Sequence, residues 1–198
     1  MTHRIGLCGS HRTGKTTLAE AISKQTGIPL IKTSTSAVFE QHGLHPAQAL
    51  DFKTRLWIQH CVIEAAVPIW QQAEKGIFIT DRTPIDFMAY TLADIQGATE
   101  VDSGELETYL AHCFEVTNQF FTKLVILQPA IKLVYEPGKA ALNKAYMEHL
   151  NTLIFGISHD ERLKCSTLVI KRHITHLEQR IETVLNGLER DRCLGRTC

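Results

Sequence analysis

The chain has 198 residues, of which 44% are hydrophobic and 21% charged, and its 21 basic side chains balance its 21 acidic ones. This length and balance are typical of one globular domain, and they argue against a large basic surface for duplex nucleic acid. No window reaches roughly 18 uninterrupted apolar residues, so we expect no membrane span. The six cysteines include no C-x-x-C pair, which favours the reducing cytoplasm over a disulfide framework.

The first predicted strand, residues 4–8, leads into a glycine-rich turn and then into a predicted helix, residues 15–26. Residues 9–16 read Gly-Ser-His-Arg-Thr-Gly-Lys-Thr, which matches the phosphate-loop pattern G-x-x-x-x-G-K-[ST]. Glycines let successive amide groups point at phosphate oxygens, and the helix N-terminus adds a favourable dipole. The lysine reaches the β- and γ-phosphates, and the next hydroxyl ligates Mg²⁺. The predicted nucleoside triphosphate site comprises Gly9, Ser10, Thr13, Gly14, Lys15, Thr16 and Thr17, with Lys15 catalytic and Thr16 on the metal.

A second strand is predicted over residues 28–32, and a hydroxyl-rich segment follows it. A long amphipathic helix is predicted from 46 to 74, with a break or bend near Pro68. Arg55 and Gln59 are four residues apart on this helix and therefore share a face. Either they grip a ligand or they belong to an ordinary solvated face, and the sequence leaves both open. Trp57 points elsewhere, and we expect it to pack in the core.

The third predicted strand, residues 76–80, ends in Asp81-Arg82-Thr83-Pro84. A carboxylate at this strand tip can hold Mg²⁺ through water or accept a proton from an attacking hydroxyl. An adjacent arginine offers a planar cationic donor to an acceptor substrate. The alternative is a local role, in which the turn caps the helix predicted over 84–95 and Arg82 makes a surface ion pair. Because a phosphate loop precedes this turn, we favour catalytic roles for Asp81 and Arg82 and a metal role for Asp81.

Alternating strands and helices continue to the end of the chain and indicate a parallel sheet with helices on both faces. A helix over 103–119 has Ser103 as its candidate N-cap, and the last helix opens with the capping-box spacing Thr175 to Glu178. We predict one domain, residues 1–190, and a flexible tail, 191–198. The remaining predicted elements are a strand over 123–127, a mobile insertion over 131–159, a strand over 167–171 and a helix over 175–188.

The phosphate loop, the Asp-Arg-Thr-Pro turn and the five-strand plan together resemble the nucleoside and nucleoside-monophosphate kinase-like P-loop proteins. Among these, the chain is similar to the small single-domain AAA/kinase relatives of bacteria and phages. The resemblance implies an α/β three-layer sandwich with a parallel sheet of order 2-3-1-4-5, and a mobile lid at about 131–160. It also implies an acceptor site between the loop after the second strand, the long helix and the Asp-Arg turn.

Candidate residues for the acceptor, as the resemblance implies them, are Thr33, Ser34, Arg55, Gln59, Arg82 and the lid residue Lys139. Arg172 follows the fifth strand, where relatives wrap the adenine. Related kinases carry arginines in the lid, whereas this chain has none between Ile131 and Asp160. Lys132, Lys139 and Lys144 are the cations available there, and a lysine cannot reproduce a bidentate arginine contact.

We therefore expect an ATP- and Mg²⁺-dependent phosphotransferase that acts on a hydroxyl or phosphate of a nucleoside- or nucleotide-type acceptor. Some phage relatives phosphorylate a hydroxymethyl pyrimidine within DNA, which would place the enzyme in the host cytoplasm, but the zero net charge does not favour DNA. The alternative is an ATPase switch, which needs a water-positioning residue and usually an arginine from a partner, and neither is recognisable. The ten histidines show no zinc-ligand spacing, so Mg²⁺ is the metal we expect.

Overall fold

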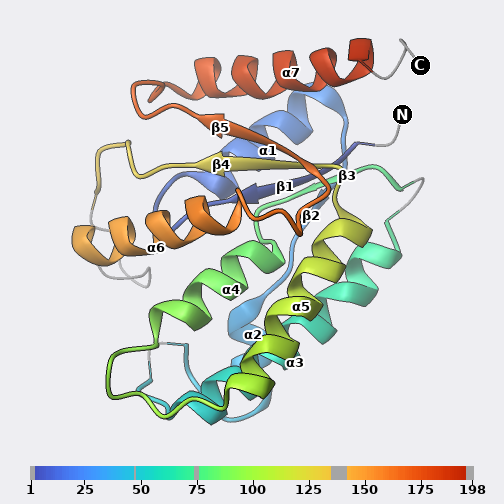
Figure 1. The fold of residues 1–198 in the computed structure, drawn as a ribbon. Coiled ribbons are helices and arrows are strands. Elements are labelled where there is room, and N and C mark those ends of the chain that lie inside the picture. Colours follow the sequence, from blue (N-terminus) through green and yellow to red (C-terminus); the bar gives the residue numbers. More distant parts are fainter. Residues whose placement is uncertain (1–2, 47, 74–75, 135–141, 195–198) are drawn as a thin grey trace.

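The computed structural model of this chain describes residues 3–46, 48–73, 76–134 and 142–194. Five parallel strands form one sheet in the order β2-β3-β1-β4-β5, which confirms the predicted order (Figure 1). The strands are β1 (Arg4–Cys8), β2 (Leu30–Ile31), β3 (Phe78–Thr80), β4 (Lys123–Leu127) and β5 (Ser166–Ile170). The helices are α1 (Lys15–Thr26), α2 (Thr35–Gln41), α3 (Phe52–Gln71), α4 (Pro84–Ala93), α5 (Ser103–Phe120), α6 (Lys144–Ile157) and α7 (Leu177–Leu194).

Helices cover both faces of the sheet and create two hydrophobic cores. In Figure 1, α1 and α7 lie above the sheet, whereas α3, α4 and α5 lie below it. The smaller core joins α1 and α7 to one face of the strands, where Ile5 and Leu7 of β1 are fully buried. The larger core packs the helices α2, α3, α4, α5 and α6 against the other face of the sheet. It contains Trp70, which packs edge-on against Phe121. The predicted three-layer sandwich is therefore confirmed.

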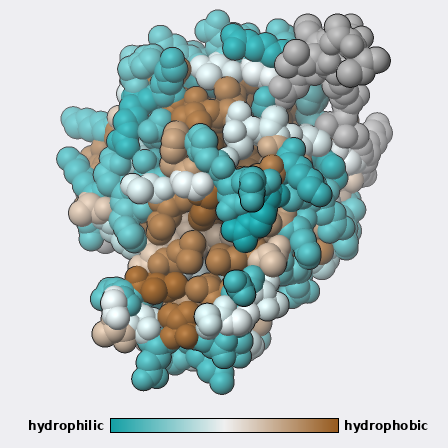
Figure 2. All heavy atoms as spheres, viewed as in Figure 1, coloured by the Kyte–Doolittle hydropathy of each residue, from teal (hydrophilic) through white to brown (hydrophobic). Residues whose placement is uncertain are grey.

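The face of the molecule seen in Figure 2 is hydrophilic at its rim, with apolar side chains visible along its middle, from below α7 down to the region of α4. In the part of the chain that the structure describes, no helix combines the length and apolarity needed to cross a membrane.

Two predictions about the long helix are wrong. Helix α3 does not break at Pro68 but continues to Gln71, although the proline removes one backbone hydrogen bond from the helix. Trp57 is not a core residue: it is 47% exposed and meets the ring of His42 edge-on. The helix buries a different face, which includes Leu56 and Ile63.

Three further differences concern helix ends and a missed helix. The side chain that caps α5 is Asp102, which accepts from the amide of Glu105, and not the neighbouring Ser103. Helix α7 begins at Leu177 rather than at 175, and it continues through 194, into the segment predicted as a tail. The second half of the predicted insertion forms α6, whose residues Met147, Leu150 and Ile154 are buried. This segment is therefore partly core, because its apolar residues recur with helical spacing.

Candidate active site

The phosphate loop and the Asp-Arg turn meet because their strands are neighbours. Strand β1 pairs in parallel with β3, with Gly6 opposite Thr80, so both loops leave the same edge of the sheet. The Thr16 hydroxyl donates to the Asp81 carboxylate over 2.5 Å. Hydroxyl and carboxylate oxygens are the ligands that Mg²⁺ takes alongside substrate phosphates, so this pair fits the predicted metal. The two residues placed on the metal by sequence therefore lie together.

The loop itself curls around the side chain of Lys15. The Lys15 ammonium donates to the carbonyl oxygens of Gly9 over 2.5 Å and Ser10 over 3.0 Å, and the Thr13 hydroxyl donates to the same Ser10 carbonyl over 2.9 Å. Burial lowers the pKa of Lys15 to about 8, although Asp86 acts in the opposite direction. Its charge is thus poorly solvated, which favours an anionic ligand at this point.

Asp86 is a central residue of the site that sequence reasoning did not single out. Its fully buried carboxylate accepts from the Gly9 amide over 3.0 Å, the Thr83 amide over 3.0 Å and the Thr83 hydroxyl over 2.9 Å. The ammonium of Lys15 lies 3.9 Å away. Burial raises the pKa of Asp86, while Lys15 and Arg82 oppose that shift. The signal in the sequence was the capping-box spacing from Thr83 to Asp86, which the structure confirms as a cap of α4.

Arg82 is positioned by a tyrosine rather than by solvent. Its guanidinium hydrogen-bonds the Tyr90 hydroxyl, which also accepts from the backbone amide of His11 over 3.1 Å. Burial disfavours the charge on Arg82, but Tyr90, Asp86 and Asp81 outweigh it and raise the pKa. The alternative of a surface ion pair for Arg82 is therefore wrong. Tyr90 connects Arg82 to the phosphate loop.

The phosphate loop, Asp81 and Arg82 line one cavity of about 370 Å³. One wall is the segment that follows β4, and the Arg12 guanidinium connects the phosphate loop to it by donating to the Val134 carbonyl over 3.0 Å. Arg12 has a φ of 62°, in the left-handed region that side-chain-bearing residues rarely adopt. The cavity is lined by His11, Arg12, Thr13, Gly14, Lys15, Thr16, Thr17, Asp81, Arg82, Ile131, Lys132, Leu133 and Val134.

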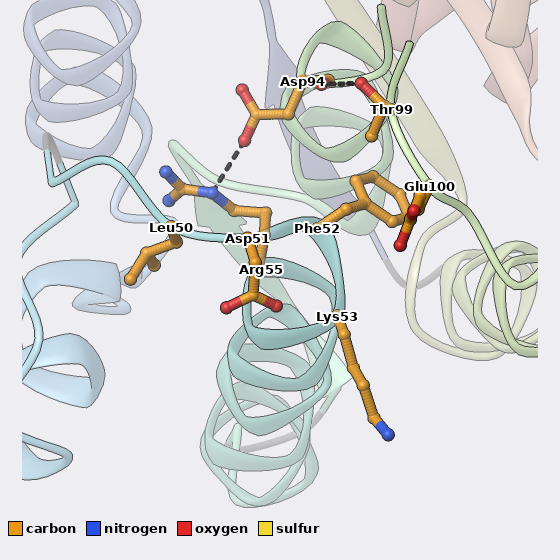
Figure 3. Close-up of a pocket in the computed structure, with 8 residues that line it drawn as sticks. All are labelled: Leu50, Asp51, Phe52, Lys53, Arg55, Asp94, Thr99 and Glu100. Atoms are coloured by element: carbon orange, nitrogen blue, oxygen red, sulfur yellow. Dashed lines mark hydrogen bonds and ion pairs between the residues drawn. The ribbon is translucent and has the colours of Figure 1, made fainter.

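The predicted acceptor residues on α3, Arg55 and Gln59, are largely buried. The alternative that they belong to an ordinary solvated face is therefore wrong. Gln59 is 5% exposed, and its side-chain oxygen has no hydrogen-bond partner among the described residues. Arg55 forms a 2.7 Å ion pair with Asp94 and donates to the carbonyl of Gln48 over 3.1 Å. Figure 3 shows Arg55 reaching toward Asp94 across a second cavity, of about 360 Å³. Arg55 lines this second cavity and not the one that holds the phosphate loop.

The other predicted site residues that the structure describes, Thr33, Ser34 and Arg172, do not line the cavity that holds the phosphate loop. The Thr33 hydroxyl is buried with no hydrogen-bond partner in the described part of the chain, and Ser34 caps α2 by accepting from the Ala37 amide over 3.2 Å. The Arg172 guanidinium is held by both oxygens of Glu148, over 2.6 and 2.7 Å, which ties the end of β5 to α6. Lys139 lies outside the described residues.

A family model described as "AAA domain" matches residues 4–127, more than half of the chain. No curated protein sequence gives a significant match. Deoxyadenosine kinase from M. mycoides superposes with a TM-score of 0.64 at 20% identity, over 94% of this chain and 98% of that one. Thymidylate kinase from Candida albicans gives 0.61 at 16% identity, over 96% and 92%. NadR in complex with NAD and AMP-PNP gives 0.63 at 13% identity, over 92% of this chain and 48% of NadR. At these identities the three structures establish a shared fold.

Proposed function

The chain belongs to the AAA domain family, and on that premise we propose that it is an ATP- and Mg²⁺-dependent phosphotransferase. The γ-phosphoryl group of ATP would pass to a hydroxyl or phosphate of a nucleoside- or nucleotide-type acceptor. The observation that carries the proposal is the convergence of Lys15, Thr16, Asp81 and Arg82 on one cavity. The kinase names of two similar folds favour this reading over hydrolysis alone.

Each side chain has a role that follows from its position. Lys15 neutralises charge on the β- and γ-phosphates, and Thr16 with Asp81 would hold Mg²⁺, which supplies further charge neutralisation when bound. When the acceptor is a hydroxyl, its oxygen bonds to the γ-phosphorus as the bond to ADP breaks, and Asp81 takes its proton. Arg82, fixed by Tyr90, holds the acceptor.

The part of the acceptor that lies away from the phosphates would meet two buried polar groups. Thr33 and Gln59 each bury an oxygen that lacks a hydrogen-bond partner among the described residues. Such atoms are costly unless a ligand or water pairs with them. We therefore assign both to acceptor binding, and we keep Ser34 and Lys139 as acceptor residues and Arg172 as a residue that binds the nucleotide near its base. Arg55 would contact the end of the acceptor that lies farthest from the phosphates, in the second cavity, which Asp94 and Thr99 also line.

The test is ADP release from ATP and Mg²⁺ across a panel of deoxynucleosides, their monophosphates, and DNA with or without hydroxymethyl pyrimidines. We expect one acceptor to raise turnover well above background. Lys15→Ala and Asp81→Ala should each lower that turnover by about a hundredfold or more. Lys24→Ala, at an exposed lysine in the last turn of α1, is the matched control and should leave it unchanged. Lys15-dependent hydrolysis that no acceptor stimulates would contradict the transferase and support an ATPase switch.

A further inference from the structure

Arg180, in the first turns of α7, is a buried arginine that the roles above leave unused. It is 3% exposed, and its guanidinium donates to the Thr13 carbonyl over 2.8 Å and to the Ile174 carbonyl over 2.9 Å. Among the described residues it forms no ion pair, and burial lowers its pKa with no acidic neighbour acting in the opposite direction. A buried charge without a counterion is costly, so its position calls for an explanation.

The contact with Thr13 determines where the next amide points. The Thr13–Gly14 peptide is trans and planar, so the Gly14 N–H is directed opposite to the Thr13 carbonyl. Arg180 holds that carbonyl from the α7 side. The Gly14 N–H is therefore turned away from α7, in the direction of the cavity that Gly14 itself lines. A charged donor on the carbonyl also polarises the peptide and strengthens the N–H as a donor.

The same guanidinium packs against the loop at close range. A side-chain carbon at Gly14 would lie 3.4 Å from an Arg180 nitrogen, and Gly14 has a φ of 86°. The contact with Ile174 also ties the segment between β5 and α7 to the phosphate loop. One cation thus ties the phosphate loop to the segment that leads into α7.

We propose that Arg180 is a positioning residue for the nucleotide phosphates: it aims the Gly14 amide at them, and their negative charge balances its own. This inference rests on the proposed nucleotide site, and it goes beyond that site by assigning a group that touches neither substrate nor metal. If Arg180 has this role, its contribution to binding affinity must grow with the number of phosphates bound at the loop.

The experiment compares the affinities of ATP, ADP and AMP, each with Mg²⁺, for the wild type, Arg180→Met and Arg180→Lys by calorimetry. We expect Arg180→Met to lower the affinity for ATP and ADP by about tenfold to a hundredfold, which is the range for loss of a hydrogen bond to a charged group. The affinity for AMP should fall by less than about threefold. Arg180→Lys should recover part of the loss. Arg190→Met, at an exposed arginine of the same helix, is the matched control and should change nothing. Equal losses for all three nucleotides, or no loss, would overturn the proposal.

A second measurement separates this inference from the proposed function. In the ligand-free protein, the ¹H and ¹⁵N shifts of the Gly14 amide should move in Arg180→Met and stay in place in Arg190→Met. An unmoved Gly14 resonance would overturn the positioning role even if ATP binds. If the wild type binds no nucleotide, the proposed function fails, and this resonance still decides whether Arg180 orients the peptide. If Arg180→Met does not fold, the milder Arg180→Lys decides by the same criteria: a loss for ATP that exceeds the loss for AMP supports the role, and equal losses overturn it.

Discussion

Replacement of Asp86 by alanine should lower the free energy of unfolding by about 3–5 kcal/mol, the range for removing one partner of a buried charge pair. The substitution leaves the Gly9 and Thr83 amides without their acceptor, and each unsatisfied buried donor costs about 1–3 kcal/mol. The Thr83 hydroxyl costs less, because the Cys8 sulfur 3.0 Å away can still pair with it. Lys15 also loses its carboxylate neighbour at 3.9 Å. The variant no longer buries a carboxylate, so the free energy that this burial costs the wild type offsets part of the loss and keeps the total within the stated range.

Urea unfolding at neutral pH measures this difference. The matched control is Asp51→Ala, which removes the exposed N-cap of α3, where the carboxylate accepts from the Thr54 amide over 2.9 Å. That substitution should cost about 1 kcal/mol, the usual worth of an N-cap. The reasoning is refuted if Asp86→Ala costs no more than Asp51→Ala, because the buried hydrogen bonds would then contribute nothing beyond a surface cap.

Gly6→Ala should destabilise the fold by about 1–3 kcal/mol, because the new carbon would lie 2.4 Å from a methyl group of the threonine that caps α4. Gly156→Ala, which meets nothing within 4 Å in a helix, should instead stabilise it by up to about 1 kcal/mol, and thermal melting of both variants checks the contrast. Arg12→Gly should be more stable than Arg12→Ala by about 1 kcal/mol, since both lose the side chain and only glycine relieves the positive φ; equal melting temperatures would contradict this. Hydrogen bonds from Arg162 hold the pKa of Asp160 at about 2, below its unfolded value of about 3.9. The pair's stabilisation, under about 1 kcal/mol at this exposure, is therefore present above pH of about 4 and lost as the pH falls toward about 2. The stability difference between wild type and Asp160→Asn should shrink over that window, and a constant difference would refute the assignment.

Local patterns predicted the phosphate-loop half of the site well. The strand over 4–8, the helix over 15–26 and the strand over 123–127 have the predicted bounds, and the Asp-Arg turn lies beside the loop. In each case, neighbouring residues carry the signal: an apolar run, a glycine turn or a strand-end carboxylate. The sheet order was taken from the family resemblance, because no local pattern encodes which strands pair.

The supporting residues could not be found in the same way. Asp86 contacts Gly9 across 77 positions of sequence, and Arg180 contacts Thr13 across 167. Such contacts depend on how elements stack, and an isolated Asp or Arg on a helix is ordinarily solvated. The prediction of Ser103 as the cap of α5 failed for a different reason, since the adjacent Asp102 is an equally good capping residue.

The two cores on opposite faces of the sheet suggest how such a molecule diversifies. Helices α1 and α7, which pack in the smaller core, carry the lysine and the arginine that grip the phosphate loop. Helices α3 and α4, in the larger core, carry Gln59, Tyr90 and the Arg55–Asp94 pair. The sheet separates the two sets except at α4, whose Asp86 and Tyr90 accept hydrogen bonds from the Gly9 and His11 amides of the phosphate loop. On the proposed function, substitutions around Gln59 and the Arg55–Asp94 pair would therefore change the choice of acceptor while the nucleotide contacts stay the same.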